Sequence, residues 1–174
     1  MLEFFKKIIA YFEANNIPYM LSGSFAMSLY TLPRATRDID FVVNLQAGDV
    51  DGLIDFFKDG YYCSKEAALD AINRQSLFNI IDHRSGFKAD FVILKKNIYR
   101  QTEFERRLKT DFYGTPVYAV SLEDLLISKL IWIQDWQNAI QMEDIKNLSL
   151  IPELQLDYVH YWVNELNLNT FNLL

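Results

Sequence analysis

Apolar residues recur along the chain with two different spacings, and these spacings predict the order of its elements. Residues 2–15 carry apolar side chains at Leu2, Phe5, Ile9 and Phe12, which is the spacing of an amphipathic helix. Short, strongly apolar runs predict strands at 19–22, 39–45, 77–82, 87–94 and 117–120. Further helices are expected at 24–31, 50–58, 64–73, 99–109, 121–135, 139–148 and 153–166.

The order of these elements predicts an α+β fold. One helix comes first, strands and helices then mix, and helices alone follow from Ser121. This order is typical of a small mixed β-sheet flanked by helices, with a C-terminal helical region. We expect a core over residues 1–120 and a helical region over 121–174 packed on it, the two forming one compact unit. Ser64 is expected to cap the helix that follows it, and Pro152 to lie in the first turn of the last helix.

Composition narrows the class of protein. The 174 residues are 51% hydrophobic and 23% charged, which is ordinary for a globular domain and excludes a disordered chain. The formal charge of −6 disfavours an extended nucleic-acid track, because binding to a phosphate backbone depends on clustered Lys and Arg. The single cysteine excludes an intrachain disulfide and a cysteine-based zinc site. Charges interrupt the N-terminal apolar segment, so we expect a cytoplasmic protein without a signal peptide or membrane span.

Two carboxylates on one predicted strand carry the clearest chemical signal. Asp38 and Asp40 are two residues apart, so a strand places both on one face while Ile39 and Phe41 point into the core. Adjacent carboxylates repel each other unless a cation lies between them. Mg²⁺ is a natural partner because it prefers oxygen ligands and usually shares them with phosphates.

A glycine–serine turn and a third acid extend this signal. Gly23 and Ser24 lie between a strand and a helix, where backbone N–H groups can meet a phosphate and glycine permits close approach. Asp90 is a charge within another apolar strand. With Asp38 and Asp40 it would complete a two-metal site, in which one ion holds a triphosphate and the other activates a hydroxyl, with Asp90 as ligand or base.

Taken in this order, these motifs resemble the DNA polymerase β-like nucleotidyltransferase superfamily. Thirteen residues separate Ser24 from Asp38, and the run Arg34-x-Thr36-x-Asp38-Ile-Asp40 looks especially like the AbiEii-type toxin nucleotidyltransferases. The resemblance covers about residues 17–94. It implies that the Gly-Ser turn and the Asp pair bind metal and nucleotide phosphates, with Arg34 and Thr36 close to the nucleotide.

A weaker resemblance continues into the C-terminal helices. The AbiEii-type pattern has Asp-x4-Lys on one helix and Asp on the next, and Asp124, Lys129 and Asp144 match it. Lys129 lies on an apolar helical face, where an ammonium group needs a counter-charge from a triphosphate or an acid; alternatively it extends outward past its aliphatic neighbours. Asp144 could pair with Lys129 or reach the acceptor. Asp124, three residues after Ser121, is favoured as a helix-capping residue over a catalytic one.

Several other side chains have two interpretations each. Arg37 could touch phosphates or simply lie on the surface. A cluster of cations could meet an acidic acceptor such as RNA: Arg100, Arg106, Arg107 and Lys109. The more common outcome is that Arg106 or Arg107 pairs with Glu103 along the helix. Aromatic residues of the C-terminal helices could line a base-stacking cleft or belong to the core: Trp132, Trp136 and Trp162.

The sequence therefore predicts a Mg²⁺-dependent nucleotidyltransferase with two ions, Mn²⁺ being the alternative metal. It would transfer a nucleoside monophosphate from an NTP to an acceptor hydroxyl on a tRNA, a protein or a small molecule. The AbiEii resemblance implies a toxin–antitoxin or defence setting and a partner toxin or antitoxin. The alternative is a catalytically silent binding module of the same fold. A P-loop enzyme is disfavoured because the chain has no Gly-x4-Gly-Lys motif.

Overall fold

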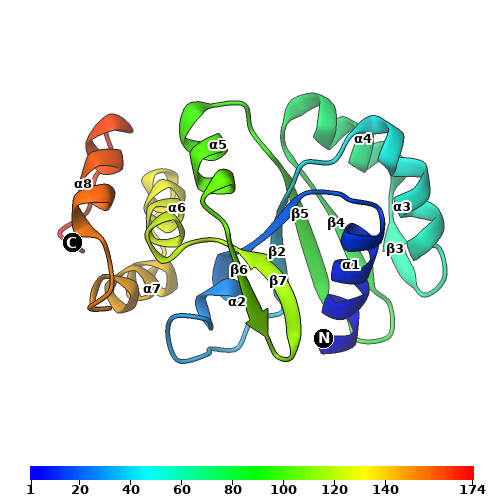
Figure 1. Ribbon diagram of the computed structural model, residues 1–174, viewed down its shortest axis with the longest axis horizontal. Helices are drawn as coiled ribbons and strands as arrows, with labels where there is room; N and C mark the ends of the chain where they lie inside the picture. The colour runs from blue at the N-terminus through cyan, green and yellow to red at the C-terminus, as the bar shows by residue number, and fades with distance from the viewer.

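A seven-stranded mixed sheet forms the centre of the molecule. The structure, a computed structural model, describes residues 1–174 (Figure 1). The spatial order of the strands is β3-β4-β5-β2-β1-β7-β6. Their bounds are β1 Tyr19–Ser22, β2 Asp38–Val43, β3 Tyr61–Cys63, β4 Leu77–Asp82, β5 Lys88–Ile93, β6 Leu108–Phe112 and β7 Thr115–Ala119. The α+β fold predicted from the sequence is confirmed.

The central strands β1, β2 and β5 determine which side chains can meet. β2 pairs antiparallel with β1 and parallel with β5. Along β2 the residues alternate between buried and half-buried, so Ile39, Phe41 and Val43 enter the core while Asp38 and Asp40 lie on the other face. A one-residue shift in register would exchange these faces, and burial of the apolar set therefore fixes the register.

Helix α1 (Leu2–Ala14) covers the apolar face of this sheet. Its ring of Phe5 stacks on Phe41 with centroids 6.1 Å apart, and Phe12 meets Phe91 edge-on at 5.7 Å. Aromatic pairs of this kind stabilise a core beyond the area that they bury. Because α1 occupies one face, the carboxylates of β2 are left on the opposite face.

Most of the remaining helices lie at the two ends of the molecule (Figure 1). Next to β3 and β4 lie α3 (Val50–Phe57), preceded by the 3₁₀ turn Ala47–Asp49, and α4 (Lys65–Arg74). At the other end of the molecule lie α6 (Leu122–Asp135), α7 (Ala139–Ser149) and α8 (Leu156–Glu165). The short helix α2 (Gly23–Met27) follows β1, and α5 (Ile98–Glu105) follows β5. No helix has both the length and the apolar composition needed to cross a membrane.

One hydrophobic cluster runs through the molecule. It contains 46 buried residues and includes side chains from both sides of residue 120, among them Phe41 of the sheet and Leu126 of α6. Burial of this size needs no disulfide or metal to maintain a folded domain.

Two strands and one helix start differ from the sequence-based expectation. β3 was not predicted, because its three residues are too few to show an alternating pattern. The C-terminal part of the helix expected over 99–109 belongs to β6, where pairing with β7 overrides the local preference. Pro152 lies in a turn and α8 begins at Leu156, so the first-turn placement of Pro152 was wrong. Ser64 caps α4 as expected, accepting a hydrogen bond from the Ala67 N–H.

Candidate active site

Strand register brings the three predicted acids onto one face of the sheet. In the parallel pair of β2 and β5, Asp40 lies opposite Asp90 and Asp38 lies opposite Lys88. All four side chains are partly covered. Neighbouring strands are about 4.8 Å apart, so side chains that face each other across this pair interact directly.

Gly23 lets the turn before α2 lie directly against Asp40. Its φ of +63° belongs to the left-handed region that glycine adopts without strain. A Cβ atom at this position would lie 2.0 Å from the Asp40 Oδ2 atom and 2.8 Å from the Asp40 Cβ atom. Ser22 pairs with Asp40 across β1 and β2, which fixes this approach. The Gly-Ser turn therefore lies directly against Asp40, one of the two acids of the Asp pair.

The electrostatics around Asp40 favour a bound cation. Burial, together with the negative charges of Asp90 and Asp38, raises the pKa of Asp40 to about 6, against the opposing effect of Lys129 and Lys88. The Oδ1 atom of Asp90 is buried and has no hydrogen-bond partner. Buried polar atoms without partners are rare, and those at a site often mark the position of an ion, a water or a ligand.

Lys88 is part of this acidic site, and sequence reasoning missed it. Its ammonium nitrogen lies 2.8 Å from Asp90 Oδ2 and 3.6 Å from Asp38 Oδ1. The hydrogen bond with Asp90 raises the pKa of Lys88. The spacing Lys88-Ala-Asp90 on a strand was the available signal, because period-two geometry places both side chains on one face. As they are arranged, no three carboxylate, imidazole or thiol side chains enclose a metal position.

A second polar network joins α6 and α7 to the Gly-Ser turn. The Lys129 ammonium group is buried and donates to Asp144 Oδ2 at 2.8 Å and to Gln141 Oε1 at 2.9 Å. Arg34 binds both carboxylate oxygens of Asp144, at 3.0 and 2.9 Å, and also donates to the Ser24 hydroxyl at 2.5 Å. The predicted pairing of Lys129 with Asp144 is present, and Lys129 does not extend into solvent.

Burial and ion pairing shift the pKa values of both Lys129 and Asp144. Burial lowers the pKa of Lys129, although its ion pair with Asp144 opposes that shift. Burial by itself raises the pKa of Asp144, but the ion pairs with Arg34 and Lys129 outweigh it, so the net shift is downward. Asp144 therefore stays ionised and holds two cations next to Ser24.

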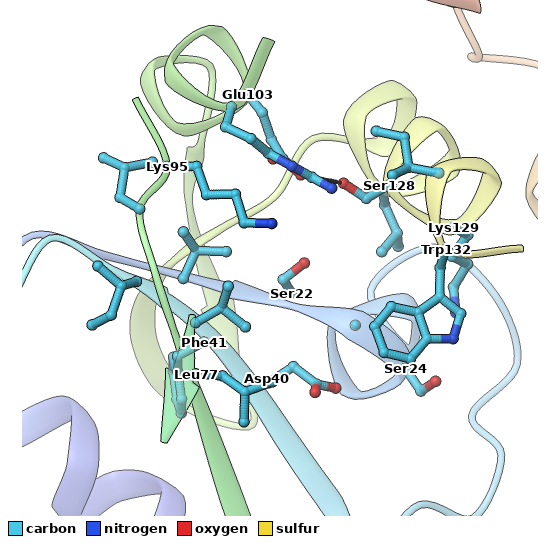
Figure 2. Close-up of a pocket in the computed structure, with 18 of the residues that line it drawn as sticks. Ser22, Ser24, Asp40, Phe41, Leu77, Lys95, Glu103, Ser128, Lys129 and Trp132 are labelled. Carbon is cyan, nitrogen blue, oxygen red and sulfur yellow. Dashed lines mark hydrogen bonds and ion pairs between the residues drawn. The ribbon is translucent and has the colours of Figure 1, made fainter. Parts of the chain in front are cut away.

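A cavity of about 570 Å³ opens between the sheet and α6 (Figure 2). Its polar end contains Gly23, Ser24, Asp40 and Lys129. Much of the rest is apolar, formed by side chains of β2, β4, β5 and α6: Val42, Leu77, Val92, Leu94, Ile131 and Trp132. Lys95 extends into the opposite part of the cavity, near Ser128 and Glu103 (Figure 2). A cavity of this size and lining is typical of small-molecule sites.

Other residues singled out in the sequence have separate structural contacts. The Thr36 hydroxyl binds the backbone N–H and C=O of Asp38, at 3.3 and 3.2 Å, so it shapes the start of β2. Arg37 is exposed. Trp162 is 8% exposed and packs on Tyr99 in the core, whereas Trp132 and Trp136 are 65% and 77% exposed beside the cavity.

Asp124 forms part of a structural network and is absent from the cavity wall. It is fully buried, accepts hydrogen bonds from Ser121 at 2.6 Å and from Tyr158 at 2.9 Å, and pairs with Arg106 at 3.0 Å. Ser121 also accepts the Asp124 backbone N–H, as expected for the cap of α6. These contacts give Asp124 the capping role that the sequence favoured.

Two of the four cations of the basic cluster near α5, Arg100 and Arg106, form ion pairs inside the protein. Arg100 pairs with Glu103 at 2.7 Å and donates to Ser128. Arg106 pairs with Asp124 and Glu123, so it does not pair along its own helix. The guanidinium of Arg107 lies over the ring of Phe104, 4.3 Å from the centroid. Internal acids therefore hold Arg100 and Arg106, while Lys109 is exposed.

The fold and this site define the protein as a nucleotidyltransferase, because a Gly-Ser turn and an Asp-x-Asp strand meet at one cavity of a mixed sheet. The comparison with protein families agrees. Residues 2–172 match the family described as "Nucleotidyltransferase of unknown function (DUF6036)", and the chain belongs to this family. The resemblance to the nucleotidyltransferase superfamily is confirmed. No curated protein sequence matches the chain significantly.

Solved structures of nucleotidyltransferases share the fold. ANT(2")-Ia, in a complex with adenylyl-2"-tobramycin, aligns with a TM-score of 0.63 and 16% identity, over 95% of each chain. The lincosamide antibiotic adenylyltransferase LnuA, bound to lincomycin, aligns with a TM-score of 0.56 and 21% identity, over 83% of this chain and 93% of LnuA. An antigenic nucleotidyltransferase-like protein from Paracoccidioides brasiliensis aligns with a TM-score of 0.56 and 18% identity, over 92% of this chain and 84% of that protein.

Proposed function

We propose that this protein transfers a nucleoside monophosphate from an NTP to the hydroxyl of an acceptor and releases pyrophosphate. The observation that carries this proposal is the contact between Gly23 and Asp40 at the polar end of the cavity. It places a backbone turn that can approach phosphates next to carboxylates that can hold a divalent cation.

The residues present fit a Mg²⁺ or Mn²⁺ site. Three hard oxygen donors, Asp38, Asp40 and Asp90, lie on neighbouring strands, and a buried oxygen of Asp90 has no partner. Mg²⁺ commonly takes one or two carboxylates and completes its shell with substrate phosphates and water, so three preassembled ligands are not required. When bound, the metal would neutralise phosphate charge and lower the pKa of the attacking hydroxyl.

The remaining site residues would bind and orient the nucleotide. Gly23 and Ser24 would contact the phosphates, and Lys129 would neutralise the charge that develops on them as pyrophosphate leaves. Arg34 would add a second cation, since it already reaches the Ser24 hydroxyl. Asp144 would hold Lys129 and Arg34 in place, and Thr36 would keep the start of β2 in position.

The transfer step follows from this arrangement. The acceptor oxygen attacks the α-phosphorus of the NTP, and its proton would pass to Asp90, the acid opposite Asp40 on the neighbouring strand. The bond between the α-phosphorus and the bridging oxygen breaks, and that oxygen leaves with pyrophosphate. Asp90 then returns the proton to solvent.

We propose a small molecule as the acceptor. Arg100 and Arg106, two of the cations expected to meet RNA, pair with internal acids, and the formal charge is −6, so the electrostatic basis for an extended nucleic-acid track is weak. The cavity is largely apolar beyond its polar end, which suits a compact acceptor. ANT(2")-Ia in complex with adenylyl-2"-tobramycin and LnuA bound to lincomycin are structures of the same fold that hold small molecules. A toxin or antitoxin partner stays a prediction from the resemblance.

A transfer assay tests the proposal. The protein is incubated with Mg²⁺, each α-³²P-labelled NTP in turn and a cell extract divided into metabolite, protein and RNA fractions. We expect labelled product in the metabolite fraction, dependent on Mg²⁺ and lost in Asp40→Asn. Asp55→Asn, on the exposed side of α3, is the matched control and should retain transfer. Absence of NTP binding and of transfer in all fractions contradicts the proposed function, and label in RNA contradicts the proposed acceptor.

A further inference from the structure

We infer that the site works with one divalent cation and that the ammonium group of Lys88 takes the place of a second. This inference rests on the proposed function and refines the expectation of two ions. The Lys88 nitrogen lies between Asp90 Oδ2, at 2.8 Å, and Asp38 Oδ1, at 3.6 Å. A second ion bound at these two oxygens would compete with the Lys88 ammonium group for them.

The strand register builds this arrangement into the sheet. Lys88 lies opposite Asp38 and two residues before Asp90, and β2 and β5 pair over six consecutive residues on each strand. The Lys88 side chain is 34% exposed, so about two thirds of its surface is covered by other residues. Its position is therefore set by the sheet and by two carboxylates.

The charge of the site also favours a single divalent ion. Three carboxylates and one ammonium group carry a net charge of minus two, which a single divalent ion neutralises. A second ion on the Asp90 oxygen that accepts from Lys88 would lie within a few ångströms of an ammonium group, and like charges at that distance repel strongly inside a protein.

The three acids would then have different roles. Asp38 and Asp40 would hold the one ion beside Gly23, where the triphosphate enters. Lys88 would hold Asp90 in position through Oδ2, while Oδ1 keeps no hydrogen-bond partner. Lys88 is thus a positioning residue for Asp90 and a fixed cation for the site.

Counting bound Mn²⁺ tests this inference. The full chain is saturated with each non-hydrolysable α,β-methylene NTP in turn, and Mn²⁺ is titrated while free Mn²⁺ is measured by electron paramagnetic resonance. We expect one Mn²⁺ per chain in the native protein and in Lys88→Arg, which keeps the cation. We expect two in Lys88→Met, with the dipolar line broadening of a close pair of ions. Circular dichroism verifies the fold of each variant.

The outcomes separate the two proposals. Two coupled ions in the native protein overturn the role of Lys88 while the proposed function stands, and this measurement does not depend on any variant. A count of one in folded Lys88→Met also overturns it, because removal of the ammonium group then opens no second position. Failure of the native protein to bind any of the four analogues refutes the proposed function and this inference with it.

Discussion

Replacing Gly23 by alanine tests the geometry of the site most directly. The substitution adds one Cβ atom to a residue with φ +63°. That atom would lie 2.0 Å from Asp40 Oδ2, 2.5 Å from Asp40 Cγ and 2.8 Å from Asp40 Cβ. Rotation of the Asp40 side chain can move the oxygen away, but its Cβ atom is fixed to the backbone. The turn and strand β2 must therefore separate.

The expected cost has two parts. Holding alanine in the left-handed region costs about 1–2 kcal/mol, and overpacking a close contact adds about 1–3 kcal/mol. Together they lower the free energy of unfolding by about 2–5 kcal/mol, which corresponds to a fall in melting temperature of about 4–20 °C for a chain of this length. Displacement of Asp40 should also weaken NTP binding in the presence of Mg²⁺ by about 10–100-fold.

Gly60→Ala is the matched control. Gly60 has φ +85° and, apart from its two chain neighbours, no residue has an atom within 4 Å of the position that an alanine methyl group would take there, so only the backbone strain applies. Both substitutions reduce the entropy of the unfolded chain equally, and that contribution cancels in the comparison. Thermal unfolding and calorimetric titration with NTP and Mg²⁺ measure the two effects. Equal melting temperatures and equal NTP affinities for the two variants would refute the close approach of Gly23 to Asp40.

Three further substitutions test other parts of the structure. Because burial and neighbouring acids raise the pKa of Asp40 to about 6, metal-free protein should lose stability as pH rises from about 4 to about 6, and Asp40→Asn should abolish that slope in denaturant melts. Lys129→Met should raise the KM for NTP at least about tenfold, unlike the exposed Lys146→Met; equal KM values would contradict the phosphate role. Asp124→Ala should cost about 3 kcal/mol in urea unfolding because it removes the buried partner of Arg106, Ser121 and Tyr158, while NTP affinity of the folded protein stays unchanged.

Most elements of the fold could be predicted because their signals are local. The apolar spacing of α1, the strands around Ile39 and Phe91, and the turn between β4 and β5 each need only a few neighbouring residues. β6 could not be predicted in this way. Its residues include Lys109 and Asp111 and show no apolar alternation, so the strand exists because β7 supplies its hydrogen bonds.

The residues of the candidate site also differ in whether a local pattern could predict them. The Gly-Ser turn and the Asp pair were predictable because Gly23, Asp38 and Asp40 lie close together in the sequence and local geometry fixes their faces. The pairing of Lys129 with Asp144 could be proposed from the AbiEii-type resemblance together with the apolar helical face around Lys129. The contact of Arg34 with Asp144 joins residues 110 positions apart, and no local pattern specifies it.

The sequence by itself determined the class of chemistry, because residue types and short spacings decide which side chains share a face. Only the tertiary structure decided how charge is distributed within the site. It placed Lys88 between Asp38 and Asp90, and it paired the cations near α5 with buried acids. Strand register and helix docking depend on burying one continuous core, so the partners of each charge are known only when the whole chain has packed.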